Sequence, residues 1–118
     1  MNWEAVWPEA PDAREAVRLE LVALAAELVT LSHCIAETLH ATAGPQADTL
    51  HASRAALAQR ASSVLDPQNA FDDITTDALR MAAATLQEDR RGMLKLRQAA
   101  EALALDGRRP GSRRVGHA

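Results

Sequence analysis

Aromatic and β-branched side chains are scarce in this sequence. Its 118 residues include three aromatic side chains and eight Val or Ile, against 26 Ala and 15 Leu. A β-strand needs branched and aromatic side chains to fill its pleated surface, whereas Ala and Leu are among the strongest helix formers. The composition therefore argues against a sheet protein and predicts an all-α fold whose helices pack closely through Ala and Leu.

Cysteines and long apolar runs are also lacking. The single cysteine, Cys34, excludes an intrachain disulfide, and because no Lys or Arg lies within a helical turn of it we expect a packed, unreactive thiol. Unbroken apolar runs fall short of the ~20 residues that span a bilayer, and the Met1–Glu4 start lacks the basic and apolar regions of a signal peptide. We therefore expect a soluble, cytoplasmic protein with no transmembrane segment.

Motifs that carry enzyme chemistry are missing as well. The sequence shows no Ser/His/Asp set, no Gly-rich phosphate loop and no CxxC pair. Three carboxylates cluster at Asp72, Asp73 and Asp77, but acids at this spacing suit the positive end of a helix better than a magnesium site. We therefore predict a protein that is not an enzyme and that needs no cofactor.

Proline and glycine divide the chain into an arm, a helical domain and a tail. Residues 1–11 form a Trp-bearing N-terminal arm that ends in the Pro8 and Pro11 region, and residues 12–106 form a single helical bundle domain. Residues 107–118 contain three Gly and one Pro among arginines, so we expect a basic, disordered tail.

A heptad row marks the first predicted helix. The helix should start near Asp12, because Asp12 and Glu15 have the spacing of a capping box. Apolar residues then recur in alternating steps of four and three, as in a coiled coil. The row is Val17, Leu21, Leu24, Leu28, Leu31, Ile35 and Thr38. Gly44-Pro45 ends this helix, and Pro45 suits the first position of the next one.

The second and third predicted helices have weaker patterns. The second runs from about Gln46 to Leu65 and stops at Asp66-Pro67, because the residue before a proline avoids helical angles. The third starts with Asp72 or Asp73 as its cap. Its apolar row ends at Asp106-Gly107 and comprises Leu79, Ala82, Leu86, Met93, Leu96, Ala100 and Leu103.

A polar stretch, residues 87–92, interrupts the apolar row of the third helix and ends in Gly92. Glycine inside a helix costs ~1 kcal/mol relative to Ala. One continuous helix is the interpretation that we favour, and a kink or break near Gly92 is the alternative.

The predicted helix lengths favour a homodimer. At ~1.5 Å per residue the long first and third helices measure ~46 and ~51 Å and the second only ~30 Å. In an up-down-up three-helix bundle we therefore expect apolar stripes to stay exposed at the start of the first helix and the end of the third, and such stripes mark interfaces. With both Trp residues, the expected interface is Trp3, Trp7, Val17, Leu21, Leu24, Leu28, Met93, Leu96 and Leu103. The alternative is a monomer whose Trp arm folds back over the bundle.

A histidine and glutamate row on the first helix offers a different function. His33, Glu37 and His40 are spaced four and three residues apart, and His51 lies just beyond the Gly44-Pro45 turn. Imidazole and carboxylate groups are ligands for zinc or iron. These four residues therefore define a possible metal site, although di-iron bundles use two Glu-x-x-His pairs and this chain has one. A phosphate-accepting histidine at His33 lacks the neighbouring residues that such modules carry.

The arginine-rich tail offers a third function. Residues 1–106 have a formal charge of −7, whereas Arg108, Arg109, Arg113 and Arg114 give the tail +4. Arginines can contact phosphates without fixed structure, but the tail has no reading helix or stacking aromatic side chain. Nucleic-acid binding is thus an alternative that the acidic body opposes.

The leading interpretation is a non-enzymatic helical interaction module that self-associates and binds a protein partner. Trp3 and Trp7 are four residues apart and are the only Trp residues in the chain. Trp is strongly enriched at interface hot spots. We therefore expect the arm to dock in an apolar groove, within the oligomer rather than on a foreign partner.

Overall fold

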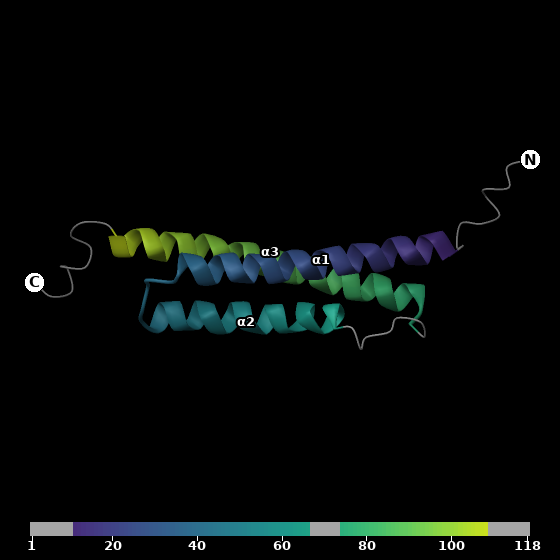
Figure 1. Ribbon diagram of the computed structural model, residues 1–118, viewed down its shortest axis with the longest axis horizontal. Coiled ribbons are helices and arrows are strands. Elements are labelled where there is room, and N and C mark those ends of the chain that lie inside the picture. Colours follow the sequence, from purple (N-terminus) through teal and green to yellow (C-terminus); the bar gives the residue numbers. More distant parts are fainter. Residues whose placement is uncertain (1–10, 67–73, 109–118) are drawn as a thin grey trace, which may run out of the picture.

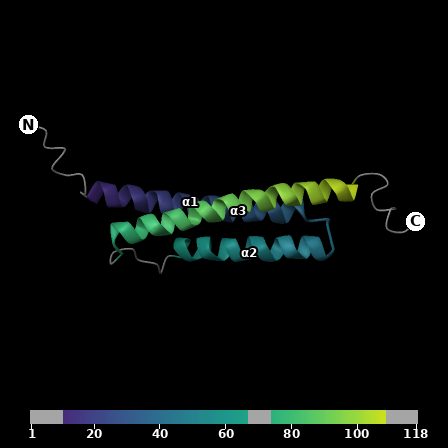
Figure 2. The same ribbon diagram turned by 180° about the vertical axis from the view of Figure 1, so that it is seen from behind.

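The computed structural model describes residues 11–66 and 74–108 and contains three helices. They are α1 (Pro11–Thr38), α2 (Pro45–Leu65) and α3 (Thr76–Arg108). Together they hold 90% of the described residues, among which there is no strand. The chain runs along α1, back along α2 and forward again along α3 (Figures 1 and 2). The predicted all-α, up-down-up three-helix bundle is confirmed.

Glycine and proline set the ends of α2 as the sequence indicates. Gly44 has a φ of 122°, which L side chains rarely adopt, and it lets the chain reverse before Pro45. Pro45 is the first residue of α2, where its missing N–H costs no hydrogen bond. Asp66 has extended angles, φ −62° and ψ 126°, because Pro67 follows it. The prediction that Asp66-Pro67 stops this helix is confirmed.

The ends of α1 differ from the predicted ones. The helix begins one residue earlier than expected, at Pro11, and ends at Thr38 rather than at Gly44. The side chain of Asp12 lies outside the described part of the chain, so the expected capping box stays a prediction. Its other member, Glu15, accepts hydrogen bonds from Arg18 Nε and Nη2 at 2.9 and 2.5 Å.

In α3 the interior is as expected and the ends are not. Asp72 and Asp73 lie outside the described residues, and the side chain that caps the helix is Thr75, whose Oγ1 accepts from the Ala78 N–H at 3.1 Å. The helix passes through Gly92 without a break and extends to Arg108, beyond the predicted end. The continuous form of the third helix is therefore confirmed.

The core lies mainly between α1 and α3, the pair of helices in most extensive contact. The predicted heptad row is confirmed as its centre, since every member from Leu21 to Ile35 is buried. From α3 the buried apolar residues are Leu79, Ala83, Leu86, Met93, Ala100 and Ala104. By contrast α2 buries only Ala47 and Ala61 fully, and its larger side chains Leu50, Leu57 and Val64 are partly buried.

The apolar stripes expected at the surface are largely buried within one chain. Leu21, Leu24, Leu28 and Met93 are at most 8% exposed, so their expected exposure is not observed. The reason is topological. The long helices α1 and α3 are parallel neighbours, and beyond the end of α2 they cover each other (Figures 1 and 2). Arg14 of α1 also donates to the Ile74 carbonyl at 2.6 Å just before α3.

The polar stretch within α3, residues 87–92, contacts both other helices. Buried Asp89 accepts two hydrogen bonds from Arg60 of α2, at 2.8 and 2.7 Å. The next residue, Arg90, donates to Glu27 of α1 at 2.8 Å. This segment interrupts the apolar row because it supplies the charged contacts that set how α1 and α2 lie against α3.

Leu28→Asp should lower the free energy of unfolding by about 3–5 kcal/mol, because the new carboxylate has no partner in the core. Leu28 is 0% exposed, whereas Leu19 on the same helix is 55% exposed. Leu19→Asp is therefore the control and should change stability by about 0.5 kcal/mol or less. Urea unfolding followed by circular dichroism measures both, and equal losses would contradict the assigned core.

Asp89→Ala should cost about 1–3 kcal/mol, the value of hydrogen bonds to a charged group. Glu88→Ala is the control, because Glu88 and Arg91 form a pair with side chains 70% and 72% exposed, and such pairs contribute little. In an Arg60→Ala background, Asp89→Ala should instead raise stability, since it removes a buried carboxylate that has lost its partner. A denaturant double-mutant cycle measures the sign, and purely additive losses would contradict the pairing.

Candidate functional site

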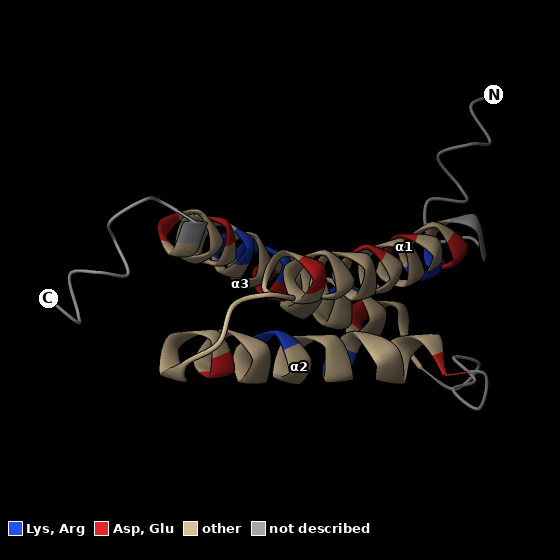
Figure 3. Cartoon of the chain, turned by 60° about the vertical axis from the view of Figure 1, so that its left-hand side comes forward, with Lys and Arg blue, Asp and Glu red and all other residues tan. Residues whose placement is uncertain are grey.

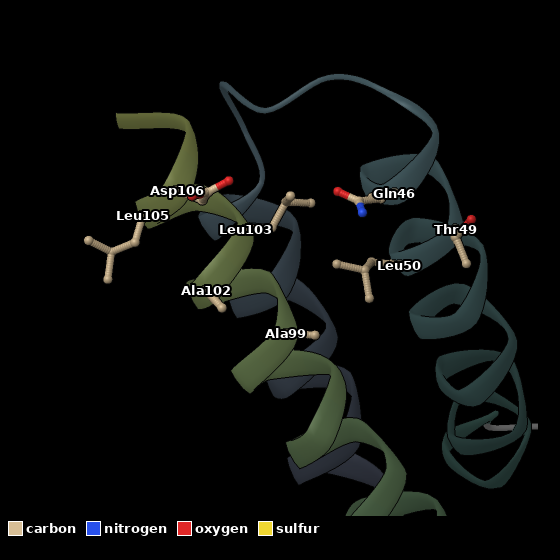
Figure 4. Close-up of a pocket in the computed structure, with 8 residues that line it drawn as sticks. All are labelled: Gln46, Thr49, Leu50, Ala99, Ala102, Leu103, Leu105 and Asp106. Atoms are coloured by element: carbon tan, nitrogen blue, oxygen red, sulfur yellow. The ribbon is translucent and has the colours of Figure 1, made fainter. Parts of the chain in front are cut away.

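An open groove lies between the start of α2 and the end of α3. Its volume is about 820 Å³, within the range of ligand and peptide pockets. Apolar atoms form most of its wall, from Leu50 on α2 and Leu103 on α3, both partly buried. The lining residues are Gln46, Thr49, Leu50, Ala99, Ala102, Leu103, Leu105 and Asp106 (Figure 4).

Small side chains on α3 leave the groove open. Leu50 and Leu103 point toward each other from the two helices, while Ala99 and Ala102 are too short to reach α2 (Figure 4). Gln46 presents its amide at the same end of the groove (Figure 4). An amide both donates and accepts hydrogen bonds. The groove can therefore bury apolar side chains and pair one polar group at its rim.

Two of the other lining side chains contribute little to the open space. The Thr49 Oγ1 donates to the Pro45 carbonyl at 2.9 Å, and Leu105, 65% exposed, points away from the cavity (Figure 4). No His, Cys or Ser is among the lining residues. Asp106 is the one charged side chain among them.

The predicted metal residues do not form a metal-holding group. His33 and Glu37 are exposed on α1, and His40 lies in the turn after the helix rather than on it, contrary to the prediction. These three residues share a shallow depression with Ala36. Within residues 11–66 and 74–108, however, no three His, Cys, Asp or Glu side chains are placed to hold a metal ion. The described geometry gives the metal hypothesis no support.

His51 has a structural contact instead. Its Nδ1 accepts from Arg54 Nε at 3.0 Å, and Arg54 Nη1 donates to the buried Ser32 Oγ of α1 at 3.1 Å. Sequence analysis missed this link because Ser32 stands beside the heptad row and resembles a surface residue. The link holds the first half of α2 against α1.

Two pairs of charged residues, Glu15 with Arg18 and Asp89 with Arg60, have shifted pKa values, and both pairs are contacts within or between helices. Hydrogen bonds from Arg18 lower the pKa of Glu15. The contribution of this pair to stability is therefore present above the usual pKa of Glu and is lost as the pH falls through the lowered pKa of Glu15. Hydrogen bonds to Asp89 raise the pKa of Arg60. Few charged residues lie on α2 (Figure 3), and they are Asp48, Arg54 and Arg60. None of the residues in the two pairs lines the groove.

The remaining predicted site residues have mixed positions. Leu103 lines the groove, and Val17 and Leu96 pack at the edge of the core. Cys34 is exposed rather than packed, because it points away from the buried side of α1. Trp3, Trp7, Arg109, Arg113 and Arg114 lie outside the described residues, and Arg108 is the last residue of α3.

One helix is long and apolar enough to cross a membrane by length and composition, over Ala13–Thr38. This criterion averages hydropathy along the helix, whereas the sequence expectation counted unbroken apolar runs, so the expectation of no transmembrane segment stays a prediction. In the bundle this helix supplies the core, and its Glu27 pairs with Arg90 of α3. Packing against α2 and α3 buries 39% of its apolar window.

Compared with protein-family models, with curated proteins and with solved structures, the chain gives no match in any of the three. Functional inference therefore depends on the groove, the buried contacts and the sequence of the two chain ends.

The exposed Cys34 should react with a thiol reagent such as Ellman's reagent in the folded protein, one thiol per chain and without denaturant. Matched variants are Cys34→Ser, which should not react, and Leu28→Cys in that background, which should react only after unfolding because position 28 is buried. Protection of Cys34 at dilute protein concentration would contradict its exposure.

Proposed function

We propose that this chain is a non-enzymatic helical interaction module. The groove between α2 and α3 is the observation that carries the proposal, because it leaves partly buried Leu50 and Leu103 facing an open space of about 820 Å³. A docked segment would remove their remaining apolar surface from water, at roughly 25 cal/mol per Å². Its walls are parts of two helices, so the occupant does not need to rearrange the fold.

The shape and chemistry of the groove favour an apolar peptide segment as the occupant. Helix-in-groove recognition uses apolar anchors on one face of a peptide, and it needs few polar contacts. The groove meets this description, with Leu and Ala side chains on its floor and Gln46 and Asp106 at its edge. Self-association is the form of this function that we expect first, since the chain itself contains such a segment in its arm.

Peptide selection tests the binding function. A display library of short peptides is panned against a full-length Trp3→Ala, Trp7→Ala chain, so that the arm's own anchors do not compete. We expect enriched peptides with apolar residues at helical spacing. Ala99→Glu, which places a charge in the groove, should weaken their binding about tenfold or more, or ~1.4 kcal/mol.

Ala84→Glu is the matched control. Ala84 and Ala99 are both exposed residues of α3, but Ala84 lies about four turns away from the groove residue. Circular dichroism should show equal helicity in both variants. Failure to enrich any peptide, or enriched peptides that bind Ala99→Glu as well as Ala84→Glu, would contradict the proposed function.

A further inference from the structure

We infer that the occupant of the groove is the N-terminal arm of a second copy of this chain, with Trp3 and Trp7 as its anchors. This inference rests on the proposed binding function of the groove and names its ligand. The arguments are the reach of the arm, the chemistry of the groove and the charges at the two ends of the bundle.

The arm is too short to reach the groove of its own chain. It ends where α1 begins, at Pro11, and the groove lies near the opposite end of α1, beside the start of α2 (Figures 1 and 2). The 28 residues of α1 span ~42 Å at ~1.5 Å per residue. A fully extended chain advances at most ~3.6 Å per residue, so Trp7 stays within ~14 Å of Pro11 and Trp3 within ~29 Å. A second copy must therefore supply the anchors.

The groove suits indole side chains. An indole buries ~150–250 Å² and keeps one N–H that needs an acceptor. Leu50, Leu103 and the small Ala99 and Ala102 supply apolar walls with space between them. The carbonyl of the Gln46 amide can accept the indole N–H at the rim. The chain has no other Trp, and Phe71, its only other aromatic residue, lies outside the arm.

The charges at the two ends of the bundle are complementary. The arm carries Glu4 and Glu9 and no Lys or Arg. Arg108 is the last residue of α3, at the groove end, and Arg109, Arg113 and Arg114 follow it in the sequence. The net charges of the arm and of the sequence after α3 are opposite in sign, which favours approach of the arm of one copy to this end of the other and speeds association, against the single acidic side chain of the groove, Asp106. The tail itself is a poor occupant, because Val115 is its only large aliphatic residue.

A two-fold axis allows each copy to give one arm and receive one. Such an isologous dimer places the arm end of each bundle beside the groove end of the other. Both grooves are then filled, so neither copy has a free groove that could bind a third copy. The groove is thus a self-recognition site whose specificity lies in two Trp side chains.

Energy transfer between two differently labelled chains tests this. The acceptor chain is full-length Trp3→Ala, Trp7→Ala with a dansyl-type fluorophore on Cys34, which is exposed near the groove end of α1. The donor chain is unlabelled Cys34→Ser with both Trp residues. After mixing, excitation of Trp should give dansyl emission that rises with donor concentration to a plateau, since only docking between chains brings the pair together.

Groove variants of the acceptor chain make the test specific. Ala99→Glu should raise the donor concentration for half-maximal transfer about tenfold or more, while Ala84→Glu leaves it unchanged. Transfer that is absent, or that is the same in both variants, would overturn the inference, as would solvent-like Trp emission from the parent chain at concentrations where light scattering finds a dimer. If peptides are still enriched in the selection described above, the arm alone is rejected as occupant and the binding function stands.

Discussion

The parallel packing of α1 against α3 is the contact on which the rest of the molecule depends. These two helices bury the leucines of the heptad row against Leu79, Leu86 and Met93, and burial of apolar side chains is the dominant favourable term in folding. Helix α2 contributes two fully buried alanines. Its position depends on partly buried Leu50, Leu57 and Val64 and on hydrogen bonds from Arg60 to Asp89 and from Arg54 to Ser32. The groove lies at the start of α2, N-terminal to both Arg54 and Arg60.

Local sequence patterns correctly predicted the features that depend on residues close in the sequence. The alternating spacing from Leu21 to Ile35 identified the buried face of α1, because any packed helix must bury its apolar stripe. Gly44-Pro45 and Asp66-Pro67 identified the ends of α2, since backbone sterics act between neighbours. The cap of α3 was not found, because Thr75 and the two aspartates before it are all residues that favour this position.

Positions that depend on partners distant in the sequence were not predictable. Asp89 looked like part of an interruption, yet it is buried because Arg60, on another helix, meets it. The exposure expected at Leu21 and Met93 failed for the same reason: helix lengths alone do not say which helices are side by side. Leu103 was in the predicted apolar row of the third helix, but only the assembled bundle shows that an open space separates it from Leu50.

Because α2 lies between α1 and α3 in the sequence, α1 is synthesised well before the helix on which it packs most extensively. The contacts between the long helices join residues 60 to 67 positions apart, from Arg14 with Ile74 to Glu20 with Gln87. Contacts so distant slow folding relative to helical proteins whose pairs are local. Until α3 has left the ribosome, the apolar face of α1 has only α2 to cover it, and the leucines and methionine of α3 that complete the core are not yet present. The nascent chain therefore passes through a stage in which its best hydrophobic surface is accessible to chaperones or to a neighbouring nascent copy.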